Sequence, residues 1–193
     1  MSIVTLASGG LDSTLMAILA REAGTQQFTL FVDYGQRSAA HELAACRRSM
    51  LAHGLPAPTV ADVSGFRNLV RSGLTDSKLH IVEDAFTPGR NLLFLLLGAA
   101  HAYEVGADAV AIGLLKEETC LFPDQTTPFL RLAESMLSES MGREIKVLAP
   151  LREFFKCDVV ELARIKGIKD TYSCHAGGDS PCGVCISCRE FQF

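Results

Sequence analysis

The sequence has no excess of positive charge. Among its 193 residues, 18 are Lys or Arg and 22 are Asp or Glu, which gives a formal net charge of −4. Because nucleic acids are bound mainly through clustered Lys and Arg side chains, this acidic balance argues against a broad surface for tRNA or DNA. We expect direct nucleic-acid binding only if the fold gathers a local basic patch.

Long hydrophobic runs are also missing. The longest apolar run covers residues 92–100 and ends before His101, far short of the roughly 20 residues that cross a bilayer. Met1 and Ser2 lead directly into the first predicted strand, without the basic region and cleavage site of a signal peptide. We therefore expect a cytoplasmic protein with no membrane partner.

The chain contains no internal repeat, low-complexity tract or linker. With 48% apolar residues it can build a substantial core, so we expect a single domain over residues 1–193. Short apolar runs alternate with helical patterns, which is typical of a doubly wound parallel sheet in the α/β class. The predicted strands cover residues 3–7, 27–33, 58–63, 109–114 and 145–148. The predicted helices cover residues 13–23, 39–53, 91–105, 128–141 and 156–165, and residues 64–86 form either short helices or a loop.

A short motif, Ser8-Gly9-Gly10-Leu11-Asp12-Ser13, follows the first predicted strand and opens a predicted helix. Adjacent glycines allow a tight turn that brings bare N–H groups against an anion, and the helix adds the positive end of its dipole. The two serine hydroxyls can donate to phosphate oxygens, and Asp12 can hold Mg²⁺. Such residues also occur in ordinary turns and helix caps. The position at a sheet edge where ligands bind favours a nucleotide phosphate site.

Four of the seven cysteines lie close together near the end of the sequence: Cys174, Cys182, Cys185 and Cys188. Four thiolates around tight turns suit a tetrahedral, structural Zn²⁺ site, so residues 174–188 are predicted to form a zinc-binding tail. Residues 182–188 are also similar to half of a ferredoxin motif, which leaves an iron–sulfur cluster as an alternative. Free or disulfide-bonded thiols are the third alternative.

Together these motifs resemble one family over nearly the whole chain. The loop matches the pyrophosphatase loop of N-type ATP pyrophosphatases, which lacks the lysine of the Walker motif. Further matching segments follow in family order at residues 31–37, 86–91, 122–124, 149–151 and 172–188. The chain thus resembles the 7-cyano-7-deazaguanine synthase (QueC) family.

The resemblance implies a Rossmann-like fold of the adenine nucleotide alpha hydrolase type, with ATP, Mg²⁺, a structural zinc ion and often a homodimer. It further implies that a small-molecule carboxylate, 7-carboxy-7-deazaguanine, is adenylated and amidated with ammonia. A second adenylation would dehydrate the amide to a nitrile. The protein would contribute positioning and charge stabilisation.

The resemblance also implies roles for individual residues. Arg37 and Arg90 are candidate cations for phosphate or carboxylate, and Asp124 matches the two adjacent donors of a guanine-like base. Lys116 and Lys156 are candidate phosphate partners. The residues expected to bind ATP are Ser8, Gly9, Gly10, Leu11, Asp12, Ser13, Asp33, Tyr34 and Arg37, although Asp33 and Tyr34 could equally well only end the second strand. Those expected to bind the substrate are Arg90, Asn91, Phe122 and Asp124, and the expected catalytic residues are Asp12, Ser13, Arg90 and Lys116.

The chain departs from the family pattern after Asp124, where Gln125-Thr126 replaces the usual Cys-Arg and a cation near the substrate is lost. This leaves a second hypothesis: a divergent relative that stops at an amide, or joins the deazaguanine acid to another amine, including a protein acceptor in antiviral defence. A tRNA-modifying enzyme with the same loop is a further alternative, which the acidic balance disfavours. A nucleotide sensor without turnover is another, which Asp12 and the two serines weakly disfavour.

Overall fold

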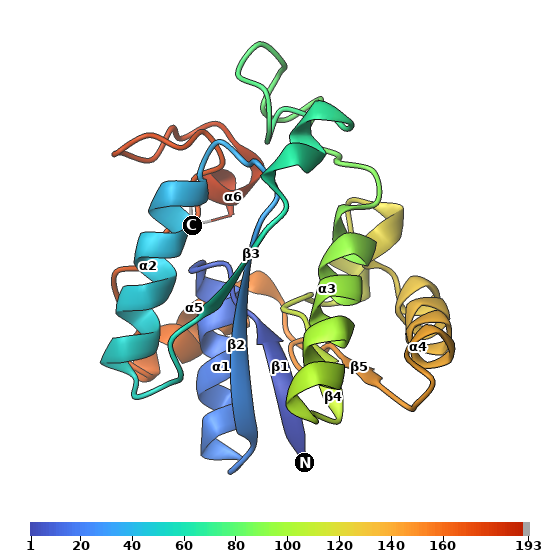
Figure 1. Ribbon diagram of the computed structural model, residues 1–193. Helices are drawn as coiled ribbons and strands as arrows, with labels where there is room; N and C mark the ends of the chain where they lie inside the picture. Colours follow the sequence, from blue (N-terminus) through green and yellow to red (C-terminus); the bar gives the residue numbers. More distant parts are fainter. Residues whose placement is uncertain (191–193) are drawn as a thin grey trace.

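The computed structural model describes residues 1–190, in which parallel strands form one sheet covered by helices on both faces (Figure 1). The strands are β1 (Ser2–Leu6), β2 (Gln26–Asp33), β3 (Thr59–Asp62), β4 (Ala109–Ala111) and β5 (Lys146–Leu148). Their order in the sheet is β3-β2-β1-β4-β5, and every neighbouring pair is parallel. The predicted doubly wound α/β class is confirmed.

The helices form two layers, with α1, α2 and α5 on one face of the sheet and α3 and α4 on the other (Figure 1). Their bounds are α1 (Leu11–Glu22), α2 (Ala39–Ala52), α3 (Arg90–Val105), α4 (Thr127–Met141) and α5 (Lys156–Ile165). Short 3₁₀ turns lie at η1 (Ser64–Asn68), η2 (Glu117–Thr119) and η3 (Pro123–Gln125), and the short helix α6 covers Ile186–Arg189. The sequence did not predict α6, because four residues are too few to show a helical period.

Apolar residues on alternate positions of β1 build a core on both sides of the sheet. Val4 and Leu6 pack with the buried residues of α3 and α4, whereas Ile3 packs with those of α1 and α5. Burial on both faces explains why the strands read as continuous apolar runs. Residues 1–190 contain no helix long and apolar enough to cross a membrane.

Strands β2 and β3 follow on one side of β1, whereas β4 and β5 lie on its other side. The order of the strands therefore reverses between β1 and β4, and the loops that follow these two strands lie next to each other. Strand β4 ends at Ala111, three residues before the predicted end, although the Ile112 N–H still donates to the Leu148 carbonyl at 2.9 Å. The cysteine tail lies at the same end of the molecule as the segment that follows β3 (Figure 1). A crevice at such a reversal is where open α/β sheets bind ligands.

Gly98 allows α3 to approach β4 closely, and this contact offers a test of the fold. A Cβ atom at Gly98 would lie 2.6 Å from Val110 Cγ1 and 3.4 Å from Leu6 Cδ2. We expect Gly98→Leu to lower the free energy of unfolding by about 1–3 kcal/mol, because the added atoms overpack the core. Urea unfolding followed by circular dichroism measures this change. Ala100→Leu, on the exposed side of the same helix, is the matched control and should change it by about 0.5 kcal/mol or less; equal losses would contradict the packing.

Candidate active site

The carboxyl ends of the strands open into a cavity of about 330 Å³. This volume falls within the range of small-ligand pockets, about 300–1,000 Å³. The cavity wall includes Ser8, Gly10, Leu11, Asp12, Ser13, Tyr34, Gln36, Glu42, Arg90, Asn91, Phe94, Cys120, Phe122, Gln125, Arg152, Lys156, Tyr172, Ser173, His175 and Glu190. The ends of β1, β2 and β4 and the beginnings of α1, α2, α3 and α5 therefore contribute to one site.

The loop between β1 and α1 is held in shape by its own side chains. The Ser13 hydroxyl donates to the Gly10 carbonyl at 3.2 Å and accepts the Ser8 N–H at 3.2 Å. The Gly10 N–H in turn donates to the Ser8 hydroxyl at 3.3 Å. The first N–H groups of α1 have no partner within the helix and lie at the positive end of its dipole. The arrangement suits the phosphate site predicted from the sequence.

Gly9 differs from the rest of the loop, because it packs under α2 instead of lining the cavity. Its φ is +80°, and a Cβ atom would lie 2.3 Å from the Glu42 carbonyl oxygen and 2.6 Å from the Cys46 nitrogen. No side chain larger than hydrogen fits there without moving backbone. Gly9 therefore lets α2 rest directly on the loop.

Asp12 forms an ion pair with Lys156, the first residue of α5. Lys156 Nζ lies 2.8 Å from Asp12 Oδ1 and 3.0 Å from Oδ2, and it also lies 3.2 Å from Glu190 Oε2. The side chains of Lys156 and Asp12 are only 14% and 27% exposed. Lys156, which the sequence suggested as a phosphate partner, thus lies beside the loop between two carboxylates.

Arg90 begins α3 and brings a positive charge into the cavity wall. Its guanidinium carbon lies 5.9 Å from the centroid of the Tyr34 ring and 6.0 Å from that of Phe94. These distances allow cation–π attraction. Within the described part of the chain, no carboxylate forms an ion pair with Arg90. Its charge is therefore available to an anionic ligand.

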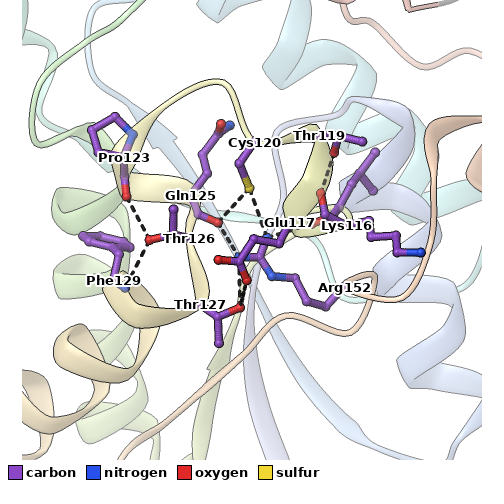
Figure 2. A network of polar contacts seen from close by, with 11 residues as sticks. Lys116, Glu117, Thr119, Cys120, Pro123, Gln125, Thr126, Thr127, Phe129 and Arg152 are labelled. Atoms are coloured by element: carbon purple, nitrogen blue, oxygen red, sulfur yellow. Dashed lines mark hydrogen bonds and ion pairs between the residues drawn. The ribbon is translucent and has the colours of Figure 1, made fainter.

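Arg152, which sequence reasoning missed, contacts the segment that includes Glu117, Cys120 and Gln125 (Figure 2). Its Nη1 donates to the Leu115 carbonyl at 2.7 Å and lies 3.5 Å from Cys120 Sγ, while Nη2 donates to the Gln125 carbonyl. Glu117 Oε2 lies 3.9 Å from Nη2, and the Arg152 side chain is 15% exposed. A guanidinium is therefore present beside Gln125, although the family's Cys-Arg dipeptide is not.

Asp124 and Asn91 hold each other at the beginning of α3. The Asn91 N–H donates to Asp124 Oδ2 at 3.3 Å, and the Asn91 amide donates to the Asp124 carbonyl at 2.9 Å. Asn91 and Phe122 line the cavity, whereas Asp124, 8% exposed, is not among the described wall residues. The carboxylate expected to bind a guanine-like base thus anchors η3 to α3, and its contact with a base stays a prediction.

Three other predicted residues lie outside the wall as far as residues 1–190 define it. Asp33 Oδ1 accepts a backbone N–H at the end of β2 at 2.9 Å, and Arg37 Nη1 donates to the Gly73 carbonyl at 3.3 Å. Lys116 Nζ lies 4.2 Å from the centroid of the Phe155 ring. The geometry gives no support to a catalytic role for Lys116, because its ammonium group packs on an aromatic ring.

The wall also contains polar groups that no local pattern had marked, among them Glu42, Glu190 and His175. Burial, together with the positive charges of Arg90 and Lys156, lowers the pKa of His175 to about 4. The imidazole is therefore neutral near pH 7. The one sequence feature that could have indicated a role for His175 in the site was its position inside the family-like segment 172–188.

The four tail cysteines converge as the sequence predicted. The Sγ atoms of Cys174, Cys182, Cys185 and Cys188 all lie within 4.8 Å of one another. Thiolate sulfurs at about 2.3 Å from a tetrahedral metal lie about 3.8 Å apart, which is within this limit. The Cys182 and Cys185 sulfurs also accept backbone N–H groups, each at 3.4 Å. The donor set and its spacing therefore fit one metal ion.

The tail is joined to the phosphate loop by direct contacts. The Tyr172 N–H donates to the Gly9 carbonyl at 2.9 Å, and the Tyr172 ring stacks on His41 at the start of α2 with centroids 5.0 Å apart. A Cβ atom at Gly177 would lie 2.3 Å from the Arg37 carbonyl oxygen. The cysteine cluster thus borders the cavity and supports one side of it.

Fold and site define a class: an α/β nucleotide-binding protein with a pyrophosphatase-type loop. The U34-tRNA thiolase NcsA from Methanococcus maripaludis, solved with its [4Fe-4S] cluster, matches with TM-score 0.60 and 17% identity, covering 98% of this chain and 63% of that one. The NMN synthetase from Francisella tularensis matches with TM-score 0.54 and 18% identity, covering 93% of this chain and 68% of that one. At such low identity these likenesses show the fold alone.

Sequence comparison shows the family. The model of the family described as queuosine biosynthesis protein QueC matches residues 2–192. A 7-cyano-7-deazaguanine synthase of Synechococcus sp. (strain RCC307) is 37% identical over 205 residues, covering 96% of this chain and 90% of its own. That of a Nitratiruptor species is 34% identical over 202 residues, covering 98% of this chain and 91% of its own. The chain belongs to the QueC family of enzymes.

The cysteine cluster leads to a prediction about bound metal. We expect the purified protein to carry about one metal ion per chain, and Cys185→Ser to lose it and unfold at a lower temperature, because metal binding contributes folding free energy. Elemental analysis and thermal unfolding measure both effects. Cys157→Ser, which removes an exposed thiol outside the cluster, should retain the metal. Full metal content in Cys185→Ser would disprove the site.

Proposed function

We propose that this enzyme converts the carboxylate of 7-carboxy-7-deazaguanine to the nitrile of 7-cyano-7-deazaguanine, using ammonia and ATP and releasing AMP and pyrophosphate. The observation that carries the proposal is the shared cavity. Five of the six residues of the S-G-G-L-D-S loop, together with Arg90 and Phe122, contribute to its wall. Groups suited to phosphate, to a carboxylate and to a flat base therefore line one cavity, and this supports the proposal.

The chemistry explains why a carboxylate and a nucleotide must share a site. A carboxylate resists attack because the nucleophile would have to expel oxide, whereas adenylation turns one oxygen into a good leaving group. Arg90 supplies a charge that can hold the carboxylate, and the loop N–H groups can hold the phosphates. Neither step needs a covalent enzyme intermediate. Positioning is therefore the main contribution of these residues.

The residues at the loop fit the Mg²⁺ that accompanies ATP. Asp12 presents a carboxylate at the helix start, and hard oxygen donors are what Mg²⁺ prefers. Mg²⁺, when bound, would neutralise phosphate charge. Lys156 lies beside Asp12 and Glu190, so it can compensate these carboxylates and contact a phosphate oxygen.

We assign the tail metal to zinc. Four thiolates with no open position fit a closed tetrahedral structural site, which d¹⁰ zinc fills without a geometric preference of its own. Stoichiometric iron and sulfide in a brown protein would instead assign the cysteines to an iron–sulfur cluster.

We also propose that the enzyme works in the cytoplasm as a homodimer, with no direct nucleic-acid partner. The exposed apolar side chains of Leu96 and Tyr103 on α3, and of Leu132 and Met136 on α4, supply a surface for a second copy.

A second candidate function rests on Gln125, which lines the cavity where the family usually has a cysteine followed by arginine. The fixed charge of that arginine is lost at the next position, Thr126, and this loss affects most the step with the highest charge. The enzyme would then stop at the amide, or join the acid to another amine, including a protein. Arg152 keeps a guanidinium on this side of the cavity, although its N–H groups are already engaged with the Leu115 and Gln125 carbonyls.

The first functional prediction concerns Asp12. We expect Asp12→Ala to abolish acid-dependent AMP formation and leave the fold intact, because the side chain lies at the open end of the sheet. AMP is measured by chromatography, and folding by circular dichroism. Glu139→Ala, on the exposed side of α4, is the control and should turn over normally. Normal AMP release from Asp12→Ala would exclude the loop as the phosphate site.

The second functional prediction separates the two candidate functions. Because the nitrile needs two activations, we expect about two AMP for each nitrile formed. Mass spectrometry of the products after incubation with 7-carboxy-7-deazaguanine, ATP and ammonia gives the ratio. About one AMP per product, with an amide or a deazaguanine-tagged protein as that product, would replace the synthase by the divergent ligase.

A further inference from the structure

Glu42 is a carboxylate in the cavity wall for which the reaction described so far has no use. It lies on the first turn of α2, and its backbone carbonyl packs against Gly9 of the phosphate loop. The side chain is half-buried, with its open side in the cavity. Glu42 is therefore close to the loop and accessible to a small ligand.

The Glu42 carboxylate is held in place but keeps acceptor capacity. Ser38 Oγ donates to Oε1 at 2.7 Å, and Gln36 Nε2 donates to Oε2 at 3.0 Å. The Gln36 amide is itself fixed, because its Oε1 accepts the Tyr34 N–H at 2.9 Å and its Nε2 also donates to the Val32 carbonyl at 3.3 Å. A carboxylate accepts about four hydrogen bonds. Glu42 thus has room for a ligand with N–H donors.

The charges around Glu42 favour a small cation that can lose a proton. Burial raises the pKa of Glu42, hydrogen bonds from Gln36 and Ser38 and the charge of Arg90 lower it, and Asp33 raises it further. The negative charge of Glu42 also raises the pKa of three neighbouring groups, Tyr34, Cys46 and Tyr172. No cation forms an ion pair with Glu42 in the part of the chain that the structure describes. A partly desolvated carboxylate with free acceptor sites attracts a cation, and the nearby Arg90 charge favours release of that cation's proton.

We propose that Glu42 binds the ammonium ion and accepts its proton, which makes ammonia available at the activated carboxylate; this rests on the proposed function. One proton passes from ammonium to the Glu42 carboxylate. The nitrogen lone pair then forms the C–N bond, the C–O bond to AMP breaks, and AMP leaves with that electron pair. The second proton of the nitrogen goes to water.

The test compares Glu42→Gln with the unchanged chain at increasing ammonium concentration. We expect kcat/KM for ammonium to fall about 100-fold, at the low end of what loss of a general base costs. Acid-dependent exchange of pyrophosphate into ATP, which precedes amine attack, should persist. Glu104→Gln, on the exposed side of α3, is the matched control and should keep the original kcat/KM.

Hydroxylamine distinguishes proton removal from a structural role, because this nucleophile is largely uncharged near neutral pH. The Glu42→Gln variant should form hydroxamate at close to the original rate. An equal loss with ammonium and hydroxylamine, or an unchanged kcat/KM for ammonium, would overturn the assignment of Glu42.

A separate binding measurement tests the ammonium site even if the proposed function is wrong. If the unchanged chain shows no acid-dependent pyrophosphate exchange, the proposed function is wrong, and binding alone decides the ammonium site. A thallous ion, which resembles ammonium in charge and size, should then give an anomalous diffraction peak beside the Glu42 carboxylate and none in crystals of Glu42→Gln. A missing peak in the unchanged chain would exclude the site.

Discussion

The close approach of α2 to the backbone of Gly9 is the contact on which the whole site depends. With a Cβ atom at Gly9 only 2.3 Å from the Glu42 carbonyl oxygen, any side chain would force α2 away from the phosphate loop. The Gly9 carbonyl also accepts the Tyr172 N–H. One glycine therefore joins the loop, the helix that carries Glu42 and the segment that leads to the cysteines. A shift at this point would disturb all three.

The cysteine cluster extends this arrangement to the far side of the cavity. Ser173 and His175 flank Cys174 and line the cavity, and Glu190 follows Cys188 and reaches Lys156. The segment offers few large apolar side chains to a core, so a bound metal would supply the free energy that orders it. A structural metal would then act on catalysis indirectly, by holding these wall residues in place.

Charges in the cavity are divided between paired and unpaired groups. Asp12 and Lys156 compensate each other, and Arg152 is occupied with carbonyls of the segment that includes Gln125. Arg90 and Glu42 influence each other electrostatically, but neither forms a close ion pair among the described residues. One can therefore receive an anion and the other a cation. This division corresponds to a reaction that joins a carboxylate to an amine.

Much of the fold could be predicted from sequence, because the determinants are local. Strand and helix patterns placed the main elements within a few residues, apart from the shorter β4 and the missed α6. The loop motif and the four cysteines indicated a phosphate site and a metal site, because short chain segments carry those geometries. Together with the family-like segments, they sufficed to identify the family.

The remaining parts of the site were decided by tertiary structure. Lys156 and Asp12 are 144 residues apart in the sequence, and nothing local distinguishes Lys156, which lies beside the loop, from Lys116, which packs on Phe155. Arg152 and Glu42 carry no motif either. Their roles follow from which strand ends the sheet order brings together, because a charge acquires its partner, its burial and its access to the cavity only when distant segments pack.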